Sequence, residues 1–180
     1  YNTSGIGIDM FTVLSHEATH ALGFFSAMQS NGLSKITNSN PGVYSLFDRY
    51  ILTNTNANVV NNSTFSYNTG TALNTNLLRY FEPTNTKSYS VYSPAAWEAG
   101  SSLSHFDGNR DNEKYVMTPA YSGGLIRTWT KGDLEVLCDL GYTLTAADFS
   151  CTDRYPIGVN DNATATSLTS PVTVNVITND

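Results

Sequence analysis

The chain has 180 residues, with nine Lys or Arg against fifteen Asp or Glu and a formal net charge of −6. This length can bury one hydrophobic core, with room for a piece of a second domain. The acidic balance argues against a nucleic-acid partner or an anionic-membrane surface, and no apolar run is long enough to form a transmembrane segment. Only 13% of the residues are charged, and a polar composition with so few charges fits a secreted or cell-surface protein.

An amphipathic helix is the first predicted element. Apolar residues recur at intervals of three and four and form one stripe: Met10, Val13, Leu14, Ala18, Ala21 and Leu22. Asp9 stands where an N-cap is expected, and Gly23 stands where a helix commonly ends with a residue in the left-handed conformation.

This helix carries HEATHALGF (His16–Phe24), which has the form H-E-x-x-H-x-x-G. Residues four apart share one helix face, so His16 and His20 can present two ring nitrogens to one zinc ion. Glu17 is placed to take a proton from a metal-bound water, as in zinc metallopeptidases. The competing interpretation is two histidines that merely share a helix face. The Glu, the apolar helix and the Gly together favour the metal site.

A catalytic zinc site normally has three protein ligands and an open position. In the long form of this motif the third ligand comes three residues after the Gly, but that residue is Ser26. A Glu on a following helix is another common choice, yet the next Glu is Glu82. The last of the three histidines, His105, is therefore the leading candidate. If it is a ligand, its nearest nitrogen lies about 3–4 Å from those of the other two histidines.

The region between residues 41 and 93 reads differently from the first helix. Asn, Gly and Thr clusters separate three short β-prone runs, which predicts hairpins inserted into the domain: Val43–Leu52, Val59–Tyr67 and Leu77–Phe81. Pro94–Gly100 then reads as one or two helical turns that end at a Gly.

Asp107–Glu113 offers oxygen ligands on alternate residues, which suggests calcium. The segment lacks the spacing of a complete EF-hand loop, and a solvated acidic loop is the competing interpretation.

A second helix is predicted from about Lys131 to Leu140. Thr130 and Asp133 form a start that resembles a capping box, and Gly141 ends the helix. Its apolar face consists of Leu134, Leu137 and Cys138. We expect this helix to pack beneath the first one, in a structural role.

The two cysteines, Cys138 and Cys151, are close in sequence. In an oxidising compartment they would form a local disulfide that ties the second helix to the segment after it. A zinc-ligand role and two unpaired thiols are the alternatives.

The last part of the chain changes character again. From Tyr155 onward there is no helix signal, and Val172, Val174 and Val176 alternate as in a half-buried strand. The segment resembles the opening of the Ig-like or cadherin-like repeats of large bacterial surface and secreted proteins.

Several of these segments, taken in order, resemble one enzyme family. HEATHALGF, the long insertion, SSLSHFD (Ser101–Asp107) and VMTP (Val116–Pro119) resemble the leishmanolysin-like branch of the metzincins. Bacterial relatives of that branch share motifs similar to three further segments: FDRYIL (Phe47–Leu52), YSPAAWEAGSSLSHFD (Tyr92–Asp107) and LEVLCDLGY (Leu134–Tyr142). The resemblance covers Gly5 to about Tyr142.

The resemblance implies an α+β fold. Residues 1–150 would form a metzincin-type zincin catalytic domain with an insertion over about 27–104, and residues 151–180 a linker and the start of an Ig-like repeat. It also implies the site residues: zinc ligands His16, His20 and His105, general base Glu17, and Met-turn residue Met117. The N-terminal sheet that borders the substrate cleft in such enzymes has no counterpart before the first helix, so we expect the chain to be a fragment.

The function that follows is that of a secreted zinc-dependent endopeptidase acting on protein or peptide substrates. The alternative is a non-catalytic surface or adhesin module that keeps a zincin-like domain. The presence of Glu17 favours the enzyme, because a binding-only site needs no base. Tyr121 could stabilise an oxyanion, but among eleven tyrosines a packing role is the favoured interpretation.

Overall fold

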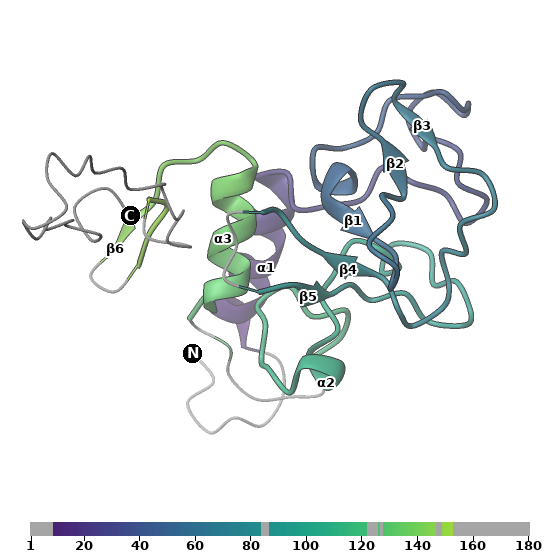
Figure 1. The fold of residues 1–180 in the computed structure, drawn as a ribbon. Helices are drawn as coiled ribbons and strands as arrows, with labels where there is room; N and C mark the ends of the chain where they lie inside the picture. Colours follow the sequence, from purple (N-terminus) through teal and green to yellow (C-terminus); the bar gives the residue numbers. More distant parts are fainter. Residues whose placement is uncertain (1–8, 84–86, 122–125, 127, 147–148, 153–180) are drawn as a thin grey trace, which may run out of the picture.

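The structure, a computed structural model, describes residues 9–83, 87–121, 126, 128–146 and 149–152. Its elements, in chain order, are α1 (Met10–Ala21), η1 (Phe47–Tyr50), β1 (Ile51–Leu52), β2 (Val60–Asn61), β3 (Ser66–Tyr67), β4 (Arg79–Tyr80), β5 (Tyr89–Ser90), α2 (Gly108–Asp111), α3 (Lys131–Asp139), β6 (Thr145–Ala146) and β7 (Phe149–Ser150). Helices combined with small antiparallel sheets make an α+β protein, as predicted (Figure 1).

Within the described residues, the strands form three small antiparallel sheets. One has three strands in the order β1-β4-β5, and β2–β3 and β6–β7 each form a two-stranded sheet. None of the helices in the described ranges is long and apolar enough to cross a membrane. The predicted Ig-like repeat after Tyr155 lies outside the described residues.

The first helix begins and ends as its sequence predicts, but it buries a different face. The Asp9 carboxylate accepts a hydrogen bond from the Thr12 backbone N–H at 3.0 Å, and Gly23 follows the helix with a φ of +107°. The predicted apolar stripe is largely exposed: the exposed fraction is 67% for Met10 and 60% for Leu14. The buried residues of α1 are polar: Thr12, Ser15, His16 and Thr19.

The predicted insertion does contain a hairpin, β2–β3, and its last run supplies β4. Its first run is mostly not a strand, because η1 precedes the short β1. Local hydrogen bonds explain the difference. The Asp48 carboxylate accepts from the Ser45 N–H at 2.9 Å, and the Asp48 N–H donates to the Ser45 hydroxyl at 3.0 Å. Such side-chain bonds compete with strand pairing.

The helical turns predicted for Pro94–Gly100 are wrong; the segment is a loop of bends and a turn. Long-range pairing closes the loop at its base. The Tyr92 N–H donates to the His105 carbonyl and the Leu103 N–H donates to the Tyr92 carbonyl, both at 2.8 Å. Inside the loop the Glu98 N–H donates to the Ser102 hydroxyl. The Tyr92 partners, 11 and 13 residues away, lie beyond the reach of a helical pattern.

An aromatic core connects segments that are far apart in the sequence. The ring of Phe24, just after α1, lies 4.7 Å from Phe47 and 5.1 Å from Phe106 between centroids. Phe47 in turn stacks on Tyr80 of β4 at 4.8 Å. All four side chains are fully buried. Phe106 directly follows His105, so the packing of Phe106 on Phe24 places His105 near the C-terminal end of α1.

The second predicted helix is α3, and its capping box between Thr130 and Asp133 is confirmed. The residues that flank α3 contact α1 and the residue after it at two points. The Trp129 indole N–H donates to the Thr19 hydroxyl at 3.0 Å, and a Cβ at Gly23 would lie 3.5 Å from the Leu140 side chain. In Figure 1 the two helices accordingly lie together.

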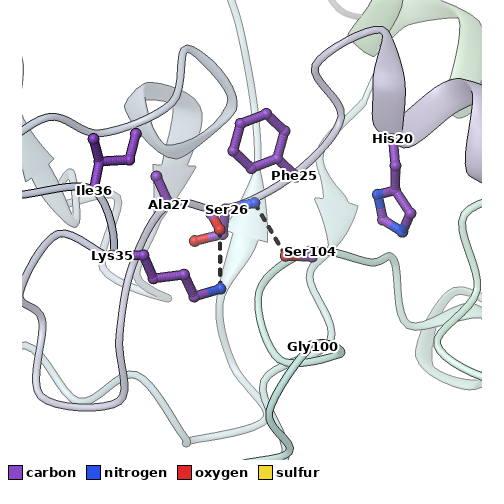
Figure 2. Close-up of a pocket in the computed structure, with 8 residues that line it drawn as sticks. All are labelled: His20, Phe25, Ser26, Ala27, Lys35, Ile36, Gly100 and Ser104. Atoms are coloured by element: carbon purple, nitrogen blue, oxygen red, sulfur yellow. Dashed lines mark hydrogen bonds between the residues drawn. The ribbon is translucent and has the colours of Figure 1, made fainter.

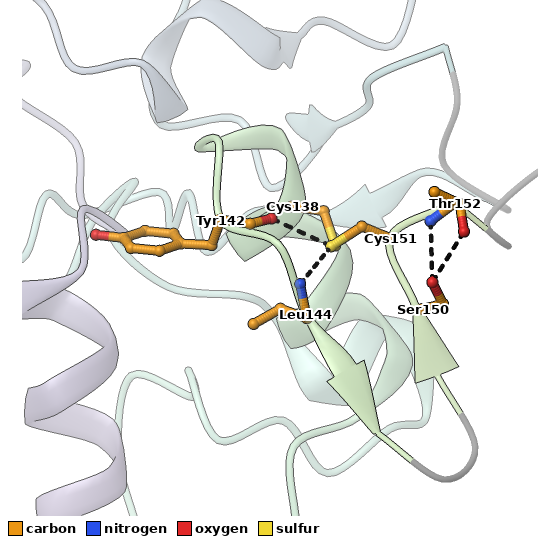
Figure 3. Close-up of a disulfide and its surroundings, with 6 residues drawn as sticks. All are labelled: Cys138, Tyr142, Leu144, Ser150, Cys151 and Thr152. Atoms are coloured by element: carbon orange, nitrogen blue, oxygen red, sulfur yellow. Dashed lines mark hydrogen bonds between the residues drawn. A yellow bond between two sulfur atoms is a disulfide. The ribbon is translucent and has the colours of Figure 1, made fainter.

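The predicted disulfide is also confirmed. Cys138 of α3 and Cys151 are joined with an S–S distance of 2.06 Å. Figure 3 shows the bridge between α3 and the β6–β7 hairpin, with Leu144 beside it. With the two sulfurs bonded to each other, neither cysteine is a free thiol in this structure.

Candidate metal centre

The three histidines of the chain converge, as the sequence predicts. His16 and His20 lie on successive turns of α1, and His105 comes from the segment that follows the three-stranded sheet. The Nε2 atom of His105 lies 3.2 Å from Nε2 of His20 and 3.2 Å from Nε2 of His16. Both distances fall inside the predicted range of about 3–4 Å. Contacts between residues 85 and 89 positions apart thus build this cluster.

Backbone carbonyls hold the opposite ring nitrogens in place. Nδ1 of His16 bonds to the Val116 carbonyl at 2.8 Å, and Nδ1 of His20 to the Phe24 carbonyl at 2.6 Å. Nδ1 of His105 bonds to the Ser101 carbonyl at 2.8 Å. A carbonyl oxygen only accepts, so each Nδ1 carries the proton and each neutral ring keeps a bare lone pair on Nε2.

This donor set fits a zinc ion. Three lone pairs that point at one another repel, and a cation between them removes that repulsion. Tetrahedral ligands at about 2.0–2.1 Å from zinc lie about 3.3 Å apart, close to the distances found here. Fixing the outer ring nitrogen on a carbonyl is also how metal-binding histidines are oriented. Within the described ranges these histidines are the group of His, Cys, Asp or Glu side chains close enough to hold one ion.

The surroundings keep the rings in the form that binds metal. Burial lowers the pKa of His105 to about 4, and the neighbouring histidines act in the same direction. Burial also lowers the pKa of His20, more than the Phe24 carbonyl and Glu17 raise it. Both rings are therefore neutral at pH 7, which metal coordination requires.

Glu17 is exposed and lies next to the cluster. Its charge is near enough to raise the pKa of both His20 and Tyr121. The Glu17 side chain is therefore accessible to solvent near His20 and Tyr121.

Met117 lies in a turn directly behind His16, and its side chain is fully buried. The contact with the histidine comes from the backbone of the preceding residue, because the Val116 carbonyl accepts from His16. Asp133 of α3 holds this turn. Its carboxylate accepts from the Val116 N–H at 3.0 Å and from the Met117 N–H at 3.2 Å.

Asp133 is therefore a positioning residue that the sequence analysis identified only as part of a helix cap. The Asp133 carboxylate both holds the Val116–Met117 turn and caps α3, because it also accepts from the Thr130 N–H and hydroxyl. Its side chain is fully buried, and burial raises its pKa despite the hydrogen bonds that lower it. Asp133 stands seventeen residues after Val116, and no local spacing in the sequence indicates that the two residues pair.

Tyr121 also contacts the cluster from behind. Its hydroxyl lies 3.0 Å from Nδ1 of His16 and donates to the Val116 carbonyl. The hydroxyl therefore supports the bond that orients His16, which differs from the packing role favoured by the sequence analysis.

The two aspartates of the acidic stretch 107–113 use their carboxylates within the protein. Asp107 caps α2 by accepting from the Arg110 N–H. Asp111 accepts from the Ser90 N–H, the Ser90 hydroxyl and the Tyr115 hydroxyl, at 2.6–2.8 Å. These bonds give the aspartates a structural role that the calcium hypothesis did not consider.

Comparison with known proteins adds no identification. No protein family, no curated protein and no solved structure matches this chain. The site must be interpreted from its own geometry.

Proposed function

We propose that this chain is the catalytic part of a secreted zinc endopeptidase of the metzincin type, similar to the leishmanolysin branch. One observation carries the proposal: three Nε2 lone pairs converge at ligand spacing while each Nδ1 is held by a backbone carbonyl. A purely structural histidine cluster has no reason to leave all three lone pairs facing one another.

The chemistry of the site divides between a metal and the protein. Zinc, when bound, supplies Lewis acidity that polarises a peptide carbonyl and lowers the pKa of water at the site toward about 7. Glu17 accepts the proton of the attacking water and passes it to the leaving amine. The exposed position of its carboxylate beside His20 and Tyr121 supports this role.

Other parts of the chain support the metzincin type. The turn at Met117 lies behind His16 and is linked to α3 through Asp133. The disulfide supports a secreted protein, because such bonds persist in oxidising compartments.

The test combines metal content with hydrolysis, measured on the full-length protein. We expect one zinc per chain and chelator-sensitive cleavage of casein. Glu17→Gln should retain zinc and lose cleavage by at least about 10²-fold, because the general base contributes that much. Glu113→Gln, a change of the same kind on an exposed acidic residue, is the matched control.

His105→Ala tests the third ligand directly. We expect zinc affinity to fall by more than the 10- to 100-fold that loss of a supporting residue typically costs. Unchanged zinc binding in this variant would contradict the site. Zinc binding without any hydrolysis by the unmodified protein would instead favour the surface or adhesin module.

A further inference from the structure

A cavity of about 300 Å³ opens directly beside His20. Its lining consists of His20, Phe25, Ser26, Ala27, Lys35, Ile36, Gly100 and Ser104 (Figure 2). Apart from the histidine, Lys35 is the ionisable side chain of that lining. A cationic group in a cavity next to a proposed reaction centre calls for a partner.

The backbone around Lys35 fixes the position of its amino group. The Lys35 N–H donates to the Ala27 carbonyl at 2.6 Å, and Met28 pairs with Ser34 in an antiparallel bridge. This tight loop follows α1 closely. The Lys35 amino group donates to the Ser26 carbonyl at 3.0 Å, as Figure 2 shows. An ammonium has three donors, so two remain for a ligand or water.

The cavity wall is continuous with the metal centre. The Ser26 N–H donates to the Ser104 hydroxyl at 3.1 Å, and Ser104 immediately precedes His105. Gly100 precedes Ser101, whose carbonyl orients His105. A Cβ at Gly100 would meet no atom within 4 Å, so the space beside this residue is open. A ligand in the cavity therefore lies against the same segments that hold the histidines.

The electrostatics favour an anion in the cavity. The Lys35 side chain is exposed; partial desolvation lowers its pKa, and the charge of Asp48 raises it. Asp48 is fully buried; its Oδ2 atom accepts from the N–H groups of Ala27 and Ser45, whereas its Oδ1 atom has no hydrogen-bond partner among the described residues. The amino group of Lys35 bonds to the Ser26 carbonyl. A carboxylate in the cavity would accept a charge-assisted hydrogen bond from one of the two remaining N–H groups of the Lys35 ammonium.

We propose that this cavity is a specificity subsite that binds a carboxylate of the peptide substrate, with Lys35 as the specificity-determining residue. The carboxylate belongs either to an Asp or Glu side chain near the scissile bond or to a free C-terminus. Phe25, Ala27 and Ile36 supply apolar walls for the carbon stem of that group. The inference rests on the proposed function only in that the ligand is a peptide at the histidine centre.

The test uses zinc-loaded full-length protein and peptides that differ at one group. One pair of peptides carries Glu or Gln beside the cleaved bond, and a second pair ends in a free or an amidated C-terminus. We expect the protein to prefer the acid of one pair by about tenfold, the value of a charge-assisted hydrogen bond. Lys35→Gln should remove the preference, Lys35→Glu should reverse it, and Lys35→Arg should retain it. Lys114→Gln, on an exposed lysine, is the matched control.

Binding of the same peptides to the Glu17→Gln variant, followed by fluorescence anisotropy, is the second readout. Acid-dependent binding that Lys35→Gln removes supports the subsite even if the unmodified protein hydrolyses nothing, in which case the proposed function fails alone. Cleavage of acid and neutral peptides at equal rates overturns the subsite and leaves the proposed function standing. If Lys35→Gln lowers thermal stability but leaves the preference for acidic peptides unchanged, Lys35 has only a structural role near Asp48, and the inference is overturned.

Discussion

The two faces of α1 reverse the usual arrangement of an amphipathic helix. The buried face carries Thr12, Ser15, His16 and Thr19, whereas Met10, Leu14 and Leu22 lie on the exposed side. Hydrogen bonds satisfy the buried polar groups. The Thr19 hydroxyl donates to the Ser15 carbonyl and accepts from Trp129, and the Thr12 hydroxyl accepts from the Ile126 N–H.

The difference shows that the position of α1 depends on specific polar partners more than on burial of its own apolar stripe. Buried polar groups are costly unless they are paired, so each partner lost on this face has a large effect. The exposed apolar side chains of α1 should contribute little to the free energy of unfolding. Mutations on the two sides should therefore differ strongly in the free energy of unfolding.

Removing Asp133 should have the largest effect. Asp133→Ala leaves the N–H groups of Val116, Met117 and Thr130 without their acceptor, so we expect unfolding free energy to fall by about 3–5 kcal/mol. Urea unfolding measures this loss, and Asp133→Asn, which keeps one accepting oxygen, should lose less. A loss below about 1 kcal/mol would show that the buried face does not depend on this network.

The histidine cluster should make the metal-free protein sensitive to acid. The unfolded chain protonates His105 as pH falls through about 6.5, whereas the folded protein keeps it neutral down to a pKa of about 4. Protons therefore favour the unfolded state, and stability is lost as pH falls below about 6.5. Between pH 6.5 and about 5 the loss should be about 2 kcal/mol, with His20 acting in the same direction. Urea unfolding in the presence of a chelator tests this slope, and His105→Gln should flatten it.

Replacing Met117 should matter less than replacing Asp133. Met117→Leu conserves volume and leaves the backbone bonds to Asp133 and to the Phe106 N–H in place. We expect a loss of unfolding free energy below about 1.5 kcal/mol, with zinc and activity retained. Complete loss of zinc from this variant would show that the Met117 side chain, rather than its backbone, supports the site.

The exposed face should give the smallest effect. Leu14→Gln changes a side chain that is 60% exposed, so we expect unfolding free energy to change by less than about 0.5 kcal/mol. The matched change on the buried face, Thr19→Val, leaves the Trp129 N–H unpaired and should cost about 1–3 kcal/mol. Thermal unfolding of both variants compares the faces directly. An equal loss of stability in both variants would show that the two faces of α1 do not differ in their contribution.

The local features of this protein follow from its sequence. Asp9 and Gly23 bound α1, and Thr130 with Asp133 starts α3, because helix ends are satisfied by residues within one turn. The pairing of His16 with His20 follows from helical spacing in the same way. No periodic pattern spans the 85 residues between His20 and His105. The prediction of His105 as a ligand therefore depended on its being the remaining histidine and on the family resemblance.

Only the tertiary structure decided the rest. A period of 3.6 residues marks the two faces of α1 but cannot say which one finds partners, and here it is the polar face. The carbonyls of Phe24, Ser101 and Val116 that fix the ring tautomers have no side-chain signature at all. Lys35 reaches the cavity beside His20 because a backbone loop brings it there. Sequence patterns determine where hydrogen-bonding and charged groups stand along the chain, but their partners depend on long-range packing, which has no local period.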